Sequence, residues 1–137
     1  MADFLKSISV AAQGLRAQAG RMRIISENIA NADSTPARAG EAPYRRKIAT
    51  FTAKLDPETG ATDVTLGRIK RDPSEFRSKY EPGHPAADAG GFVKKPNVDM
   101  LIESADMREA QRSYEANVSV ISTARRMIAR TLDILKA

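Results

Sequence analysis

The prolines divide this chain into three parts. All seven prolines lie within residues 32–96, which also hold six of the eight glycines, and neither residue type occurs after Pro96. Because proline lacks a backbone donor and cannot continue a helix, long helices are restricted to the two ends. We therefore predict a mainly α protein with an N-terminal coiled-coil helix over residues 1–31, a β-hairpin and extended arm over 32–96, and a C-terminal coiled-coil helix over 97–137.

Apolar side chains in both end segments recur at alternating intervals of three and four residues, the spacing of a coiled-coil seam. Two such helices joined by the middle segment are expected to form an antiparallel pair, with Leu5 near Leu135 and Ile29 near the turn at 110–114. Asn31 is expected to close the first helix in a left-handed conformation. The predicted seam, which is also the predicted assembly surface, comprises Leu5, Ile8, Leu15, Met22, Ile29, Met107, Tyr114, Val118, Ile121, Ile128, Leu132 and Leu135.

A single narrow seam offers little burial for two helices of this length, so the isolated pair should be marginally stable. Small residues occupy the other faces and would let further helices approach closely. We therefore expect an assembly of identical or related subunits in which the terminal helices become fully ordered. The small residues are Ser7, Ser9, Ala11, Gly14, Ala17 and Gly20 in the first helix, and Ser104, Ala105, Ala116, Ser119 and Ser122 in the second.

Two β-like runs stand in the middle segment, "YRRKIATFTAKL" and "TDVTLGRIKRD", joined by the turn-forming "DPETGA". They predict a hairpin. Each run shifts its apolar alternation once, which indicates a bulge near Gly67. The following "YEPGHPAADAGGFVKKP" is rich in proline and glycine and is expected to form an extended, irregular arm.

Three stretches carry a resemblance that covers essentially the whole chain: "ISENIANADST", "YEPGHPAADAGGFVKKPNVD" and "MREAQRSYEANVSVISTARRMIARTLDIL". With these stretches the chain resembles the bacterial flagellar basal-body rod proteins, and among them those of the proximal rod. The resemblance implies a structural subunit, without cofactor, that assembles helically with its own copies and other rod proteins to transmit torque. It further implies export through the flagellar type III apparatus, contact with the rod cap, and a place in the rod where it crosses the periplasm.

By the same resemblance, Asn28, Ile29, Ala30 and Asn31 match the motif of flagellar axial proteins, and Asn117 stands in the "YEAN" of the C-terminal helix. Asn28 and Asn31 share a helical face, so they can bond loop or neighbouring-helix groups and fix axial register. The alternative is that Asn31 only caps the helix and that Asn28 is solvated.

The net charge of +5 favours an alternative function, a basic helical module that binds nucleic acid or an acidic partner protein. The basic residues are spread along the chain, however, and no aromatic residues are interleaved with them for base stacking. Arg125 interrupts the seam, where it either extends to water or meets an acidic neighbour.

Catalytic and metal-binding signals are scarce. The absence of cysteine excludes disulfides and thiolate sites, and the only histidine, His84, lies between Gly83 and Pro85, where a rigid turn is the simplest interpretation. We expect no enzyme activity and no small-molecule substrate. No stretch approaches the roughly 20 apolar residues of a membrane helix, and the N-terminus lacks the pattern of a Sec signal peptide.

Overall fold

The computed structural model describes all 137 residues and divides them into two compact units. Unit 1 comprises Met1–Met22, Thr50–Arg68 and Arg108–Ala137, and unit 2 comprises Arg23–Ala49 and Ile69–Met107. Each unit therefore draws on the N-terminal, middle and C-terminal parts of the sequence.

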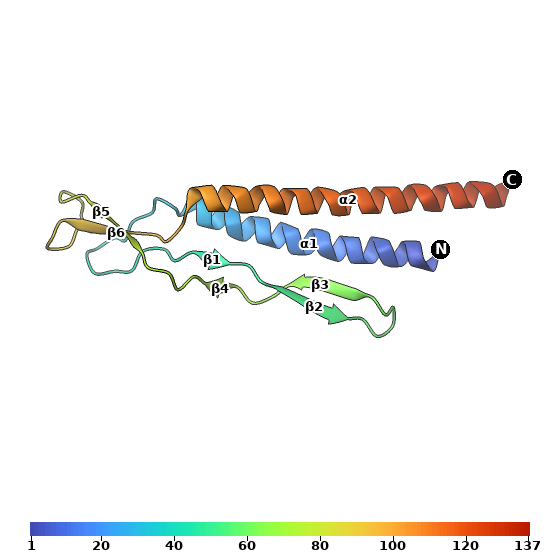
Figure 1. Cartoon of the computed structure of the whole chain (residues 1–137), viewed down its shortest axis with the longest axis horizontal. Coiled ribbons are helices and arrows are strands. Elements are labelled where there is room, and N and C mark those ends of the chain that lie inside the picture. The colour runs from blue at the N-terminus through green and yellow to red at the C-terminus, as the bar shows by residue number, and fades with distance from the viewer. The chain divides into compact units, whose positions relative to one another are not determined.

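Two long helices and three short strand pairs make up the fold (Figure 1). Helix α1 spans Ala2–Ala30 and helix α2 spans Met100–Lys136. Asp99 caps α2, since its side-chain Oδ1 accepts a hydrogen bond of 2.9 Å from the Leu101 amide. The predicted fold class, an antiparallel helix pair with a small β insertion, is confirmed. Neither helix combines the length and apolar character that would let it cross a membrane.

The register of the helix pair differs from the prediction. In unit 1, Gly14 of α1 faces Asn117 of α2, and Arg21 Nη2 lies 3.3 Å from Glu109 Oε2. This register places Leu5 more than two helical turns away from Leu135. The prediction aligned the two helix ends, whereas α2 is longer than α1, with 37 residues against 29. The last turns of α2 therefore extend past the start of α1, and Leu135 is 75% exposed.

Small residues form the contact between the helices in unit 1. Ala11 and Ala17 of α1 and Ala110 and Ala124 of α2 are buried. A Cβ atom at Gly14 would lie 2.8 Å from Asn117 Nδ2, so glycine lets the helices approach here. Our assignment of Ala11, Gly14 and Ala17 to faces directed at other subunits is therefore wrong. Gly14 lies at the contact between the two helices, and Ala11 and Ala17 are buried within the chain.

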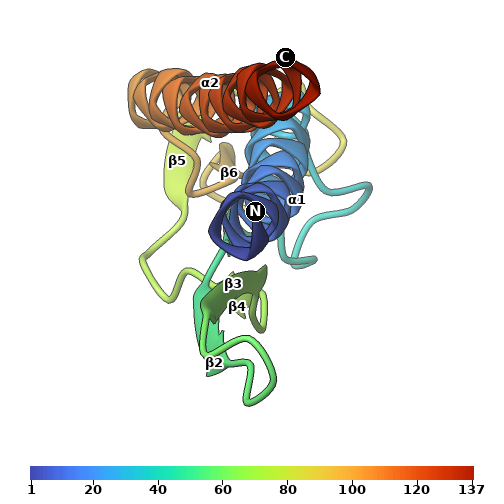
Figure 2. The same cartoon turned by 90° about the vertical axis from the view of Figure 1, so that its right-hand side faces the viewer.

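In unit 1, α1 lies between α2 and a hairpin (Figure 2). The hairpin pairs β2, Phe51–Leu55, with β3, Thr62–Leu66, in antiparallel register. The side chain of Leu66 contacts Gly20, where an added Cβ would lie 2.9 Å from the leucine Cδ2. Gly20 thus also makes room for a neighbour within its own chain.

The same two runs of sequence form a second pair in unit 2, β1 over Lys47–Ile48 and β4 over Lys70–Arg71. Between the two pairs, the first run contributes residues 49–50 and the second contributes 67–69, which is one residue more. The predicted bulge near Gly67 is thereby confirmed. A side chain at Gly67 would lie 2.7 Å from Thr52 Oγ1.

The predicted irregular arm is instead a further hairpin. Strand β5, Arg77–Tyr80, pairs with β6, Phe92–Lys95, in antiparallel register. Of the prolines and glycines in this stretch, all but Pro96 lie in the loop at 81–91. In this loop Asp88 Oδ1 accepts hydrogen bonds of 2.9 Å from the amides of Gly90 and Phe92. The prediction failed because the proline and glycine content of the loop was taken to describe the flanking residues as well, and these form strands.

Gly91 closes this hairpin, and we expect Gly91→Ala to cost more stability than Gly40→Ala. Both glycines have left-handed φ angles, 82° and 87°. A Cβ at position 91 would lie 2.8 Å from Tyr80 Cε2, whereas one at position 40 has open space. The backbone strain of about 1–2 kcal/mol is common to both variants. Urea unfolding should therefore separate them, and equal losses would contradict the role of the Tyr80 contact.

Candidate functional site

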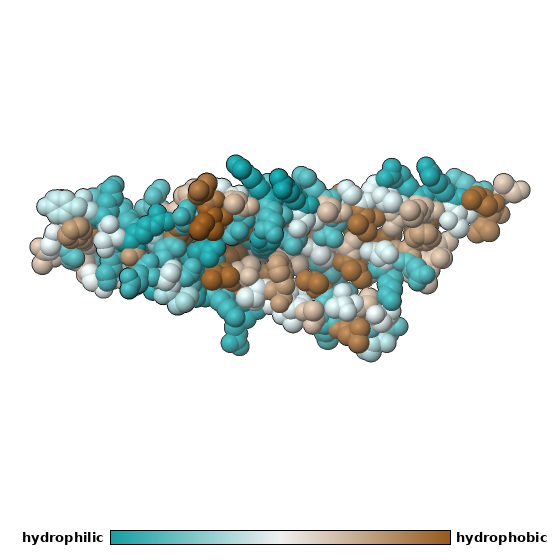
Figure 3. All heavy atoms as spheres, in the orientation of Figure 1, coloured by the Kyte–Doolittle hydropathy of each residue, from teal (hydrophilic) through white to brown (hydrophobic).

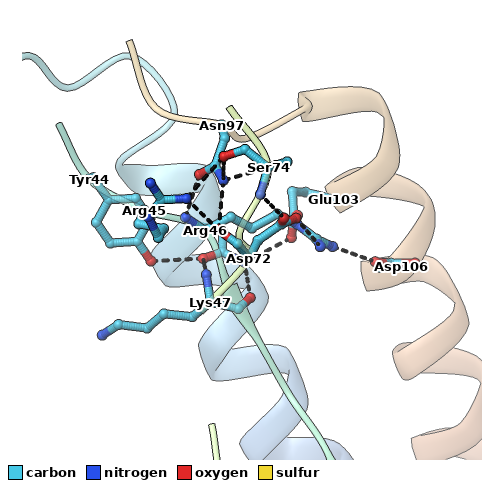
Figure 4. A network of polar contacts seen from close by, with 10 residues as sticks. Tyr44, Arg45, Arg46, Lys47, Asp72, Ser74, Asn97, Glu103 and Asp106 are labelled. Atoms are coloured by element: carbon cyan, nitrogen blue, oxygen red, sulfur yellow. Dashed lines mark hydrogen bonds and ion pairs between the residues drawn. The ribbon is translucent and has the colours of Figure 1, made fainter. Parts of the chain in front are cut away.

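Two of the most deeply buried side chains of unit 2 are polar. Glu103 of α2 is 0% exposed and Asn28 of α1 is 1% exposed. Glu103 lies with Tyr44, Arg46 and neighbouring side chains where the two helices meet the segments around β1 and β4 (Figure 4). Asn28 is hydrogen-bonded to Glu103 and to Tyr44. Because burial of polar groups without partners is costly, the hydrogen bonds of this network determine what the site can do.

Asn28 uses every hydrogen-bonding position of its side chain within the chain. Its Nδ2 donates to the Lys47 carbonyl at 2.8 Å and to Glu103 Oε2 at 3.2 Å. Its Oδ1 accepts from the Lys47 amide at 2.9 Å and from the Tyr44 hydroxyl at 2.7 Å. The two bonds to Lys47 reproduce the reciprocal pairing of neighbouring β residues. Asn28 thus attaches α1 to the start of β1 as a strand partner would.

A second asparagine holds the other edge of the same backbone. The Arg46 amide donates to Asn97 Oδ1 at 2.8 Å, and Asn97 Nδ2 donates to the Asp72 carbonyl at 3.1 Å. Successive amides of an extended chain point in opposite directions. Arg46 and Lys47 therefore find their partners on opposite sides, one in Asn97 and the other in Asn28.

Arg46 is surrounded by three carboxylates. Its guanidinium forms an ion pair with the buried Glu103 and lies 3.3 Å from Asp72 and 3.4 Å from Asp106. Burial opposes the charge, but the hydrogen bonds and charges of Glu103 and Asp72 outweigh it and raise the Arg46 pKa. The Ser74 amide, hydrogen-bonded at 2.9 Å, holds the pKa of Asp72 below its usual range, with a further contribution from Arg46.

Tyr44 completes the network as a permanent donor. Burial, together with the charges of Glu27 and Glu103, raises the pKa of Tyr44 to about 12. Its hydroxyl therefore stays protonated at physiological pH and donates to Asn28 Oδ1.

The network offers neither a nucleophile next to a base nor a group poised for proton transfer. Its hydrogen bonds and ion pairs hold α1, α2 and the hairpin backbone of unit 2 in fixed positions relative to one another.

The residues of the predicted axial-protein motif differ in whether they take part in this network. Asn28 is its centre, so the alternative that it is solvated is wrong. Ile29 is half-buried and Ala30 is exposed. Asn31 donates from Nδ2 to the Glu27 carbonyl at 2.9 Å, and no residue other than glycine has a positive φ, so the expected left-handed conformation of Asn31 is wrong. Asn117 donates to the Ser113 carbonyl at 3.0 Å.

The predicted seam residues lie away from the buried centre of either unit. None of the twelve is buried. The half-buried members are Ile8, Leu15, Met22, Ile29, Met107, Tyr114, Ile121 and Ile128, and the exposed members are Leu5, Val118, Leu132 and Leu135. The structure brings Leu15, Val118 and Ile121 together in the lining of one hollow.

Sequence reasoning missed Arg46, Glu103 and Asn97. One signal for Glu103 was present, because it stands seven residues before Ala110 and thus on the same inward face of α2. An acidic residue on a buried face indicates a buried ion pair. The alternating partners of Arg46 and Lys47 left no comparable signal in the sequence.

His84 accepts a hydrogen bond of 3.0 Å from the Ala86 amide through Nδ1, in the loop of the β5–β6 hairpin. This contact agrees with the rigid turn that was predicted. No group of three or more histidine, aspartate or glutamate side chains is arranged to hold a metal ion.

Comparison with known proteins identifies the family. Residues 8–36 match the family "Flagella basal body rod protein", and residues 89–134 match "Flagellar basal body rod FlgEFG protein C-terminal". The chain is 52% identical to flagellar basal-body rod protein FlgC of Agrobacterium fabrum over 128 residues, 93% of this chain and 92% of the relative. The chain belongs to the FlgC family of flagellar basal-body rod proteins.

More distant FlgC proteins cover the chain equally well. The identity is 36% to FlgC of Salmonella typhimurium, over 95% of this chain and 96% of the relative, and 38% to FlgC of Bacillus subtilis, over 95% and 97%. The resemblance to proximal rod proteins is thereby confirmed, and the protein is a structural rod subunit of the flagellar basal body. The two family matches contain Asn28, Asn97, Glu103 and Asn117, whereas Arg46 and Asp72 lie between them.

Proposed function

We propose that this FlgC-family subunit places its terminal helices in a helical tube with those of neighbouring copies and other rod proteins, and transmits torque through many interhelical contacts. The observation that carries this proposal is the exposure of the apolar seam. Val118 is 45% exposed, Leu132 is 41% exposed and Leu135 is 75% exposed. A single chain leaves these side chains in water, and packing against neighbouring helices would cover them.

The polar network supports the same role. A subunit that transmits torque must pass force between its helices and its β segments without sliding. Asn28, Arg46 and Glu103 tie these parts of unit 2 together through buried, directional bonds. The proposed role is mechanical and uses neither catalysis nor a cofactor.

A chain that assembles in the rod must also be transported to the rod. We infer that the chain is exported through the flagellar type III apparatus, and is placed with the help of the rod cap in the part of the rod that crosses the periplasm. A cysteine-free chain is suited to this route, because it reaches an oxidising space with no thiols to mispair.

A tag in the β2–β3 turn tests the proposal. Glu58 is exposed at this turn, where a short insertion leaves both strands intact. Cells that lack the chain should be non-motile, and the tagged chain should restore swimming and appear at the rod in micrographs of isolated basal bodies. Motile cells without the chain, or a tag absent from purified basal bodies, would overturn the proposal.

A DNA-binding measurement tests the alternative function, a basic helical module that binds nucleic acid. A nucleic-acid-binding function predicts affinity for duplex DNA that falls by about three to five orders of magnitude between 50 and 200 mM salt if six to ten phosphates are contacted. The rod function predicts no such specific binding, and it predicts full activity in variants that remove exposed basic residues such as Lys70.

A further inference from the structure

The loop of the β5–β6 hairpin contains a turn that a histidine side chain closes. His84 Nδ1 accepts a hydrogen bond of 3.0 Å from the amide of Ala86, two residues further along the chain. The chain contains no other histidine. Histidine is the side chain that ordinarily gains its charge between pH 8 and pH 5. Mild acidification therefore acts directly on this contact.

The local sequence makes the Ala86 amide the first donor that follows His84. Pro85 has no amide proton, and it favours an extended backbone for the residue before it. Two turns meet at this point. The His84 amide donates to the Glu81 carbonyl at 3.0 Å, and the Ala87 amide donates to the His84 carbonyl at 2.9 Å. The backbone of His84 belongs to both turns, so the imidazole is held next to the amide from which it accepts.

Aspartates make the same contact elsewhere in the chain. In each case a carboxylate oxygen accepts a hydrogen bond of 2.9 Å from the amide two residues later, at Asp56, Asp72, Asp88 and Asp99. Such Asx-turns are a common means of fixing a loop. Carboxylates as a class titrate at about pH 4 and so remain acceptors in mild acid. Of these turns, only the one at His84 uses an acceptor that mild acid converts into a donor.

A proton on Nδ1 would remove the acceptor of the Ala86 amide. A neutral imidazole accepts at Nδ1 only when its proton is on Nε2, whereas the imidazolium carries a proton on both nitrogens. Ala86 is 5% exposed, so its amide would have little access to water as a substitute acceptor. His84 is half-buried, and Figure 3 shows hydrophilic residues, drawn in teal, over much of the region of this hairpin. The ring can therefore exchange protons with water.

The charged and titratable side chains around the loop give a protonated ring no partner. They are Glu81 and Asp88 in the loop, Arg77, Lys79, Tyr80, Lys94 and Lys95 on the two strands, and Asp33 after α1, whose charge acts on Lys79. Glu81 is already paired with Lys79 at 2.9 Å and with Lys95 at 3.6 Å. No ion pair or side-chain hydrogen bond joins any of these groups to His84. Protonation thus removes one contact of the ring and supplies none.

We propose that His84 makes the tip of the β5–β6 loop pH-dependent: the neutral ring closes the turn at 84–86, and protonation opens it. The base of the loop is held by bonds without a titrating partner. The Glu81 amide donates to the Gly91 carbonyl and the Asp88 amide to the Phe92 carbonyl, both at 2.9 Å. The change is therefore confined to residues 82–87, where it exposes Ala86 and leaves the strand pair intact.

Nuclear magnetic resonance of the purified full chain between pH 8 and pH 5 tests this device. At the upper end of the range, the imidazole nitrogen shifts should report a neutral ring with its proton on Nε2. Amide exchange is expressed as a protection factor, which corrects for the intrinsic effect of pH on exchange. The protection factor of the Ala86 amide should fall by about tenfold as His84 becomes protonated, the effect of losing one buried hydrogen bond. That of the Asp88 amide, at the base of the loop, should not change.

His84→Asn provides the matched control. Asparagine can accept the Ala86 amide as the aspartates of the other turns do, and it does not titrate. The Ala86 amide of this variant should be equally protected at both ends of the pH range. The same fall in the variant would assign the effect to another group, such as Glu81, and would overturn the role of His84.

The natural chain alone can also refute the device. An Ala86 amide that is equally protected at both ends of the range would show that protonation leaves the turn closed. An amide without protection in the neutral form would show that the contact does not hold the turn. A parallel fall at Asp88 would mean that the whole hairpin unfolds, which contradicts a change confined to the tip of the loop.

Discussion

Replacing Arg46 by methionine is expected to lower the free energy of unfolding of unit 2 by about 3–5 kcal/mol, the usual cost of leaving a buried charge without its partner. Glu103 is fully buried, and Arg46 is its counterion. Methionine fills a similar volume, so the loss would reflect charge and hydrogen bonding more than packing. Urea unfolding followed by circular dichroism, together with hydrogen exchange of the Lys47 amide, measures it.

The adjacent arginine provides a matched control. Arg45 donates to the carbonyls of Asp72 at 2.6 Å and Ser74 at 3.0 Å, and lies 4.2 Å from the centre of the Phe76 ring. These partners are neutral, so Arg45→Met leaves no buried charge and is expected to cost about 1 kcal/mol. Equal losses at the two positions would contradict a dominant role for the Arg46–Glu103 pair.

A rescue variant separates charge from geometry. Adding Glu103→Gln to Arg46→Met removes the uncompensated charge and keeps an oxygen that accepts from Asn28 Nδ2. The double variant should therefore be more stable than Arg46→Met alone. If it is less stable, the network depends on the geometry of Arg46 and its charge is secondary.

The elements of this fold that were predictable from sequence are those fixed by local chemistry. Both helices begin and end within a few residues of the predicted positions, because proline and glycine are absent from α2 and the prolines begin beyond α1. The β1–β4 and β2–β3 pairs, with the bulge at Gly67, follow from alternation and a turn-forming sequence.

Register and contact faces were not predictable in the same way. Large apolar residues at seam spacing, such as Leu15 and Val118, suggested the contact between the helices, but Gly14 and the buried alanines form it. A glycine opposite an asparagine permits a closer approach than two large side chains do. The apolar pattern therefore located a surface of the helix pair. The contact between the helices depended on the sizes of side chains that lie about 100 residues apart in the sequence, such as Gly14 and Asn117.

The polar network lay furthest from what local patterns reveal. Arg46 meets Glu103, Asp72 and Asp106 from segments far along the chain. Among the members of this network, only Asn28 was singled out beforehand, through the resemblance to axial proteins. Its four bonds give that position a physical meaning, because only a side chain with two donors and two acceptors can serve both Lys47 and its other neighbours.

The two asparagines of the motif provide the second large prediction. Asn28→Asp should lower the free energy of unfolding by about 3–5 kcal/mol at neutral pH, since it buries a second carboxylate beside Glu103. The introduced oxygen would face the Lys47 carbonyl and Glu103 Oε2, two acceptors that now receive hydrogen bonds from Nδ2. Urea unfolding with circular dichroism measures the loss, and swimming of cells that carry the variant reports its effect on the rod.

The same isosteric change three residues later provides the control. Asn31 is half-buried and donates from Nδ2 only to the Glu27 carbonyl of its own helix, so Asn31→Asp should cost about 1 kcal/mol. The two variants should also differ with pH. Burial beside Glu103 raises the pKa of the carboxyl introduced at position 28, so its destabilising effect is greatest above that pKa and shrinks as falling pH restores a donor. A similar, pH-independent loss at both positions would mean that the motif acts through helix capping and that Asn28 does not join α1 to the hairpin and α2.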